Sequence, residues 1–144
     1  MSREQAPDFC LPTLNKDQTV CLHDLRGKAV LLSFWVTWCP SCQADLPKKE
    51  VFARSLDASR FAFYFYTINV TGREADPDRV EPFIREHGYR FPVLLDHGRS
   101  TYDAYEISSV PTSVLINPEG RIVGRYGEET PFTDVIQDLG RLLG

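Results

Sequence analysis

The stretch "FWVTWCPSC" places two cysteines, Cys39 and Cys42, two residues apart in this 144-residue chain. They follow the apolar run 29–36 and precede a polar segment, so we expect Cys39 at the junction between a buried strand and a helix. The unpaired N–H groups and the positive dipole at a helix N-terminus stabilise a thiolate, which is the nucleophile of disulfide exchange. One turn of helix places Cys42 close to Cys39 in space. Cys39 can then attack a substrate disulfide, and Cys42 can resolve the mixed disulfide.

Neighbouring residues agree with this chemistry. Pro40 suits the first turn of a helix, and Trp35 and Trp38 are expected to form a flat apolar surround near the thiols. Two other interpretations stay open at this point. The cysteines could be inert core residues, or they could join Cys10 and Cys21 in a four-thiolate zinc site. The ten residues between Cys10 and Cys21 disfavour the zinc site, because they do not form a second two-residue knuckle.

Charge and hydrophobicity argue against two classes of protein, nucleic-acid-binding proteins and membrane-spanning proteins. The formal net charge is −4, which argues against a nucleic-acid partner, and no apolar run is long enough for a membrane span. The start, "MSREQAPDF", lacks the apolar region of a signal peptide, so the sequence indicates either a cytoplasmic protein or a mature or trimmed form. A membrane anchor in a longer form stays open.

Periodicity predicts strands alternating with helices. We expect a hairpin over 8–25, then strands at 29–36, 60–70 and 91–96 and a strand–turn–strand unit over 111–126. Helices are expected from Ser41 to about Ser59, from Asp76 to Gly88, near 100–105, and from Thr130 onward. Lys48 and Lys49 are expected on a solvated helix face. This order predicts one α/β domain over 1–144, with a partly parallel central sheet covered on both faces and an antiparallel closing pair.

The hairpin has a second pair of thiols. If Asn15 and Lys16 form its turn, counting outward places Cys10 directly opposite Cys21 on the same face. Directly opposed residues are about 4.5–5.5 Å apart between Cα atoms, inside the range of a disulfide. We therefore predict a structural Cys10–Cys21 disulfide, with two reduced thiols as the alternative. A formed bridge would favour an oxidising compartment.

Several motifs together resemble a known family. The stretch "FWVTWCPSC" behind "AVLLS" resembles the active-site motif of the thioredoxin superfamily, and "SVPTSVLINPEGRIVGRYG" resembles its cis-proline loop and closing hairpin. The opening residues 6–42 and "HGYRFPVLLD" resemble the TlpA/ResA-like branch of bacterial thiol–disulfide oxidoreductases. The resemblance implies a thioredoxin-like fold: a central mixed sheet with helices on both faces, an N-terminal β-hairpin and an inserted helix–strand element.

The resemblance also implies roles for single residues. Cys39 matches the nucleophile, Cys42 the resolving cysteine, and Pro111 the cis-proline opposite them. The backbone of Val110 would pair with an extended substrate, and Trp38 and Pro40 are expected to contact substrate too. Ser33 stands where ordinary thioredoxins have a buried aspartate that moves protons. The branch lacks that aspartate and often uses a loop glutamate, for which Glu74 is the candidate.

The predicted function is protein-disulfide exchange through the CxxC motif without a cofactor. The resemblance implies an extracytoplasmic reductant, periplasmic or at the cell surface, with cytochrome c maturation among the roles of the branch. Its partners would be disulfide-bearing or dithiol proteins and an upstream electron donor protein. The first alternative is a thiol peroxidase of the redoxin type. Peroxiredoxins place Thr or Ser three residues before the reactive cysteine, where this chain has Val36 before Cys39 and Cys39 before Cys42. The second alternative is a metal-binding module, which the CxxC spacing disfavours because copper-delivery relatives use CxxxC.

Overall fold

The computed structural model describes residues 4–56 and 63–143. Its centre is a five-stranded sheet in the order β5-β4-β3-β6-β7, and a separate two-stranded sheet pairs β1 with β2. The strands are β1 (Cys10–Pro12), β2 (Thr19–Cys21), β3 (Ala29–Trp35), β4 (Phe63–Asn69), β5 (Val93–Leu95), β6 (Thr112–Ile116) and β7 (Ile122–Tyr126).

The central sheet is mixed, as the sequence predicts. Strand β3 pairs parallel with β4, and β4 pairs parallel with β5, because helices connect these strands. On its other side β3 pairs antiparallel with β6, and the turn after Ile116 makes β6 and β7 antiparallel. Every residue of β3 is buried, which explains why this strand is a continuous apolar run and not an alternating one. The predicted fold class is therefore confirmed.

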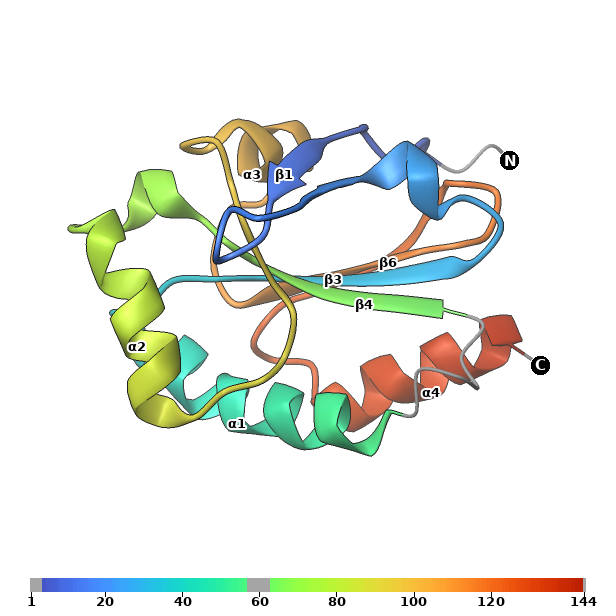
Figure 1. The fold of residues 1–144 in the computed structure, drawn as a ribbon. Coiled ribbons are helices and arrows are strands. Elements are labelled where there is room, and N and C mark those ends of the chain that lie inside the picture. The colour runs from blue at the N-terminus through green and yellow to red at the C-terminus, as the bar shows by residue number, and fades with distance from the viewer. Residues whose placement is uncertain (1–3, 57–62, 144) are drawn as a thin grey trace.

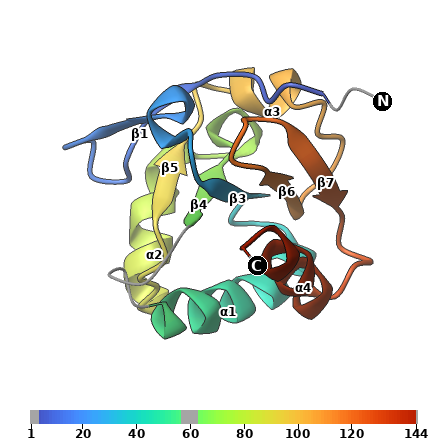
Figure 2. The same ribbon diagram turned by 90° about the vertical axis from the view of Figure 1, so that its right-hand side faces the viewer.

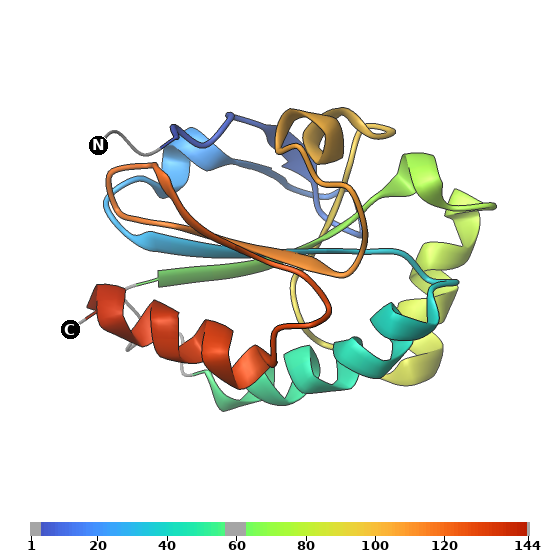
Figure 3. The ribbon, with the colours of Figure 1, turned by 180° about the vertical axis from the view of Figure 1, so that it is seen from behind.

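Helices cover both faces of the sheet. They are α1 (Pro40–Ser55), α2 (Val80–His87), α3 (Ser100–Ala104) and α4 (Phe132–Leu143), with short 3₁₀ turns η1 (Leu22–Leu25), η2 (Thr71–Arg73) and η3 (Pro77–Arg79). Figures 1 and 3 show α1 and α4 together on one face, with α3 and the β1–β2 hairpin on the other. The rings of Phe52 on α1 and Phe132 on α4 meet edge to face, with centroids 5.4 Å apart. Figure 2 shows α2 beside β4 and β5, toward α1.

Element boundaries follow local signals. Asp76 accepts a hydrogen bond from the Asp78 N–H and so caps the turn that leads into α2, and Gly88 ends this helix with a left-handed φ of 67°. The predicted first helix ends at Ser55. Its predicted extension to Ser59, and the start of the strand predicted from residue 60, fall on residues 57–62, outside the described residues.

The hairpin has the predicted register but a different turn. Cys10 lies opposite Cys21, and Pro12 lies opposite Thr19. The predicted two-residue turn is wrong: the loop comprises residues 14–17, closed by a hydrogen bond from the Thr13 N–H to the Gln18 carbonyl. A tight two-residue turn of type I′ needs positive φ at both central residues, but only Lys16 has it, at 61°. Opening the loop by one residue on each strand leaves the outer pairs unchanged.

Candidate active site

Cys39 is the residue that precedes the first turn of α1, at the end of the buried strand β3. Its backbone is extended, with φ −84° and ψ 122°, and its Sγ accepts a hydrogen bond from the Cys42 N–H at 3.4 Å. Pro40 occupies the first helical turn, where the missing N–H costs nothing. Cys39 is therefore a helix N-cap whose sulfur takes one of the free N–H groups of the helix.

The two thiols differ in their environment. Cys39 is half-buried, whereas Cys42 is 0% exposed. Burial is the main cause that raises the pKa of the Cys42 thiol far above its ordinary value of 9.0. Both cysteines are free thiols. The pair thus combines an accessible sulfur, that of Cys39, with the buried Cys42 thiol, which stays protonated until a base accepts its proton.

The segment opposite the thiols is the loop before β6. The Val110–Pro111 peptide bond is cis, as the resemblance implies. The Cys39 thiol donates a hydrogen bond to the Val110 carbonyl oxygen at 3.7 Å. The fold therefore brings Val110, which is 71 residues further along the chain, against the Cys39 sulfur. The substrate contact predicted for Val110 stays a prediction.

The two tryptophans of the motif have different surroundings. Trp38 is 50% exposed, and its indole N–H donates to the Arg73 carbonyl oxygen at 2.8 Å. Trp35 is only 1% exposed and packs against Phe83 and Phe91 in the core. Trp35 therefore presents no open surface to a substrate, because Phe83 of α2 and Phe91 before β5 pack against its ring, and its predicted place beside the thiols stays a prediction. Trp38 and Pro40 are the exposed neighbours of Cys39.

Glu74 joins the loop after β4 to the residues before Cys39. Its carboxylate accepts hydrogen bonds from the Thr37 N–H at 2.7 Å and from the Thr37 hydroxyl at 2.5 Å. It also accepts one from the Asn69 side-chain amide at 2.8 Å. Within the described part of the chain, none of its hydrogen bonds goes to either thiol. The contacts thus give Glu74 a place beside the active-site loop, and its predicted proton-shuttle role stays a prediction.

Ser33 lies under the site on β3, where the resemblance places an aspartate in ordinary thioredoxins. Its hydroxyl is hydrogen-bonded to the Ser113 hydroxyl of β6 at 2.8 Å, and both residues are buried. A serine pair satisfies itself in the core without a charge. This strand therefore offers no carboxylate to the buried Cys42.

Sequence reasoning missed a buried ion pair on α1. Lys49 was predicted on a solvated face, but it is 3% exposed, and its ammonium donates to the Asp45 carboxylate. Its Nζ also lies 4.4 Å from the centre of the Phe132 ring of α4. The expectation is wrong because α4 packs over this side of α1, which no local pattern reveals. Cys42, Asp45 and Lys49 follow at spacings of three and four, a helical spacing that signals one shared face.

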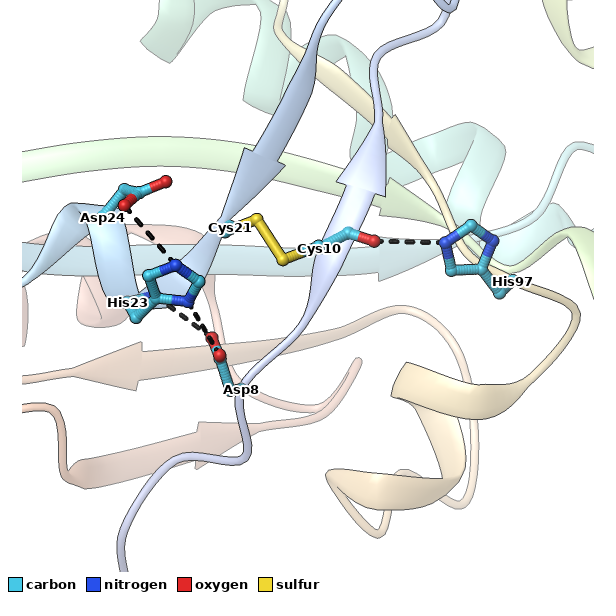
Figure 4. The surroundings of a disulfide bond; sticks show 6 residues. All are labelled: Asp8, Cys10, Cys21, His23, Asp24 and His97. Carbon is cyan, nitrogen blue, oxygen red and sulfur yellow. Dashed lines mark hydrogen bonds and ion pairs between the residues drawn. A yellow bond between two sulfur atoms is a disulfide. The ribbon is translucent and has the colours of Figure 1, made fainter.

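The second pair of cysteines forms the predicted bond. Cys10 and Cys21 are joined in a disulfide with an S–S distance of 2.08 Å (Figure 4). His23 lies beside it, with Nδ1 2.8 Å from the Asp8 carboxylate, and His97 Nε2 lies 3.1 Å from the Cys10 carbonyl oxygen. His23, Cys10 and Cys21 form the one group of three metal-type ligands found among residues 4–56 and 63–143. The two sulfurs are bonded to each other and are not available as thiolates for the four-cysteine zinc site considered above.

Comparison with known proteins gives the family. The model of the AhpC/TSA family matches residues 3–125. The chain is 36% identical over 118 residues to the thiol–disulfide oxidoreductase ResA of Bacillus subtilis, covering 82% of this chain and 63% of that protein. It is 30% identical over 131 residues to ResA of Bacillus thuringiensis, covering 88% of this chain and 70% of that protein. The chain thus spans about two thirds of the length of these relatives.

A solved structure adds support for the fold. The exposed lipoprotein thioredoxin of Streptococcus pneumoniae superposes with a TM-score of 0.77 at 27% identity, covering 94% of this chain and 100% of that one. Among the described residues no helix is long and apolar enough to cross a membrane. The names of the relatives support the predicted protein-disulfide oxidoreductase activity. On this evidence the chain belongs to the AhpC/TSA family of thioredoxin-like proteins and is related to the ResA-type thiol–disulfide oxidoreductases.

Proposed function

We propose that this chain is one thioredoxin-like domain that exchanges disulfides with partner proteins through Cys39 and Cys42. One observation carries the proposal: a half-buried thiol caps a helix N-terminus and a fully buried thiol lies one turn behind it. The free N–H groups and the dipole of the helix favour the thiolate form of a capping cysteine. Exposure decides which sulfur a protein substrate can reach, and only Cys39 is accessible.

The reaction has two steps. The Cys39 thiolate attacks one sulfur of the substrate disulfide, the mixed disulfide forms, and the other substrate sulfur leaves as a thiolate that takes up a proton. The Cys42 thiol then loses its proton and its sulfur attacks Cys39. The Cys39–Cys42 disulfide forms, and the second substrate sulfur leaves. The substrate gains two electrons, and an upstream dithiol protein must return them to the pair.

Substrate would bind beside the cis-proline loop. The Val110 carbonyl oxygen already faces the Cys39 sulfur, so an extended segment next to Val110 would have its disulfide at the nucleophile. Trp38 and Pro40, which flank Cys39 in the sequence, offer exposed apolar surface. We assign these three residues to substrate contact.

We further propose that the protein works outside the cytoplasm as a reductant, with cytochrome c maturation as one of its roles. The Cys10–Cys21 disulfide supports this, since structural disulfides persist in oxidising compartments. The name of the pneumococcal neighbour, an exposed lipoprotein, supports it too. Measuring the reduction potential of the Cys39–Cys42 pair tests the direction of electron flow: a value close to about −270 mV, that of thioredoxin, fits a reductant, and one close to about −120 mV refutes it.

Two variants test the assignment of the thiols. Cys39→Ser should abolish reduction of a disulfide-linked fluorescent peptide, and Cys42→Ser should accumulate a mixed disulfide between Cys39 and the peptide. The matched control is Cys10→Ser/Cys21→Ser, which should retain activity because it leaves the CxxC pair intact. If activity survived in Cys39→Ser and disappeared in the control, Cys10 and Cys21 would be the reactive pair in place of Cys39 and Cys42.

A further inference from the structure

The β1–β2 hairpin carries a group of metal-type side chains that the exchange reaction leaves unused. Cys10, Cys21 and His23 each offer one ligand atom, and these atoms all lie within 4.8 Å of one another. Cys10 and His23 are exposed and Cys21 is half-buried, so both a reductant and a metal ion can reach the group from solvent. None of these residues belongs to the CxxC motif, and what they can do goes beyond the proposed function.

Backbone pairing brings the three residues together. β1 and β2 pair antiparallel with Cys10 opposite Cys21. His23 follows shortly after Cys21, and its backbone N–H donates to the Asp8 carboxylate at 3.1 Å, which turns His23 toward the sulfurs (Figure 4). Because these hydrogen bonds do not involve the sulfurs, the register that gathers the ligand atoms can persist when the S–S bond is reduced.

Asp8 also orients the imidazole of His23. Its carboxylate lies 2.8 Å from Nδ1, so in neutral His23 the proton is on Nδ1 and Nε2 keeps its lone pair. Metal-binding histidines are commonly held in this way, by a carboxylate on the ring nitrogen that does not bind the metal. Asp24 Oδ1 lies 3.5 Å from Nε2, on the free side of the ring, and the Asp24 side chain is 70% exposed, which leaves it room to rotate.

This set of donors suits Zn²⁺. Zinc prefers thiolate and imidazole ligands in a tetrahedron, at about 2.3 Å from sulfur and about 2.0–2.1 Å from nitrogen, so neighbouring ligand atoms are about 3.3–3.8 Å apart. The distance of 3.5 Å between Asp24 and His23 Nε2 already falls in this range. The sulfurs and the imidazole lie within 4.8 Å of one another, so small side-chain rotations complete the tetrahedron once reduction frees the sulfurs.

We propose that the hairpin of the reduced protein is a Zn²⁺ site, and that the disulfide and the ion are alternative cross-links between β1 and β2. The ligands are Cys10, Cys21, His23 and Asp24, and Asp8 supports His23 from behind.

A dithiol protein supplies the two electrons that open the site. The S–S bond breaks, the two hairpin sulfurs take up two protons, and the donor leaves as a disulfide. The two thiols then release these protons as they bind Zn²⁺. A disulfide-bearing partner that takes the two electrons back restores the S–S bond and releases the ion.

Zinc titration of the full chain tests the site. Cys39→Ser/Cys42→Ser is the background, because it leaves Cys10 and Cys21 as the only thiols. This protein is reduced with a phosphine, transferred to reductant-free buffer under argon, and titrated with Zn²⁺ against a chromogenic chelator. Each reduced chain should bind a single Zn²⁺ and release about two protons at pH 7, since ordinary cysteines have a pKa of about 8.5. The air-oxidised form should lack this binding, because bonded sulfurs are not thiolates.

Substitutions in the same background identify the ligands. Asp8→Asn should weaken Zn²⁺ binding about 10–100-fold, as loss of a carboxylate behind a histidine ligand does. His23→Gln and Asp24→Asn each remove a ligand and should weaken binding by more than Asp8→Asn does. The matched control is His97→Gln. His97 is exposed and its Nε2 lies 3.1 Å from the Cys10 carbonyl oxygen, but it is outside the ligand group, so its loss should leave the affinity unchanged.

Cobalt spectroscopy gives a readout of the ligands themselves. Co²⁺ added to the reduced background should show a sulfur-to-cobalt charge-transfer band and the intense d–d bands of a tetrahedral complex, and Cys21→Ser should lose both. Circular dichroism checks that each variant is folded. Equal Zn²⁺ binding by the oxidised and reduced forms, or unchanged affinity in His23→Gln, overturns the inference. Since the background lacks the CxxC thiols, a failure here leaves the proposed exchange reaction untouched.

Discussion

The Cys39 thiol faces the carbonyl oxygen of Val110 at 3.7 Å, across the gap between the helix N-terminus and the cis-proline loop. The two residues come from different halves of the chain and meet because β6, which follows the loop, pairs directly with β3, which precedes Cys39. The pairing of Ser33 with Ser113 sets this alignment a few residues away from the thiol. The geometry of the site thus depends on sheet register.

Selective alkylation tests the order of the thiols. With less than one equivalent of iodoacetamide, the reduced protein should be modified on Cys39, because Cys42 is fully buried and burial raises its pKa. Peptide mass spectrometry measures the ratio of the two adducts. Cys39→Ser is the control and should react far more slowly than the wild type. Modification found mainly on Cys42 would reverse the assigned roles.

Glu74→Gln tests the link between the loop after β4 and the active site. A neutral amide accepts the Thr37 and Asn69 hydrogen bonds less strongly than a carboxylate, and hydrogen bonds to charged groups contribute about 1.5–3 kcal/mol. We expect a loss of about 1–3 kcal/mol in the free energy of unfolding, with a slower peptide-reduction rate. Urea unfolding and the rate measured across pH check this.

The matched control for Glu74 is Glu86→Gln, on an exposed position of α2. It should change neither stability nor rate. A Glu74 variant with wild-type stability and wild-type rate at every pH would leave Glu74 without a role in the site.

Removal of the hairpin disulfide should lower stability without stopping exchange. The bridge closes a short loop, since its cysteines are 11 residues apart, and the chain-entropy model gives at most about 3 kcal/mol for such a loop. The measured loss in Cys10→Ser/Cys21→Ser should be smaller, because hydrogen bonds such as Leu14 N–H to the Val93 carbonyl still hold the hairpin. The urea concentrations at the unfolding midpoints of the wild type and of the double variant measure this loss of stability. Non-reducing peptide mapping that finds both thiols free in air-oxidised protein would contradict the bond.

The Asp8–His23 pair predicts a pH dependence of stability. The hydrogen bond to Asp8 raises the His23 pKa above 6.5, so its contribution is complete below pH 6.5 and is lost as pH rises through the raised value. Burial opposes ionisation of Asp8, but the hydrogen bonds from His23 lower its pKa below 3.8 overall, so its contribution is lost as pH falls through that lowered value. The pair is therefore most stabilising between these limits.

Thermal unfolding of Asp8→Asn at several pH values checks this window. The difference in unfolding temperature from the wild type should be largest at about pH 5.5 and should shrink at about pH 9, where His23 is neutral. Glu119→Gln, an exposed carboxylate in the turn between β6 and β7, is the control and should show no such maximum. A difference that grows toward high pH would show that the ion pair is not the cause.

Many features of this protein follow from local sequence. The apolar run 29–36 and Pro40 place Cys39 between a strand and a helix, because strand burial and the proline at a first turn are local properties. The alternation around residues 10–21 sets Cys10 opposite Cys21, since a shift by one residue would turn the apolar side chains to solvent. The cis bond at Pro111 is predicted only from the family resemblance, because cis bonds are rare even before proline.

Other features depend on segments that meet only in the folded chain. Lys49 looks solvated in sequence, yet Phe132, 83 positions further along, covers it with α4, and a partner carboxylate makes that burial possible. Trp35 and Trp38 are neighbours in one motif, but α2 covers the first ring and leaves the second exposed. The sequence by itself determines which residues can react and the order and type of the main elements. Only tertiary packing decides which charges are buried beside the resolving thiol, because burial depends on contacts between elements that the local pattern does not contain.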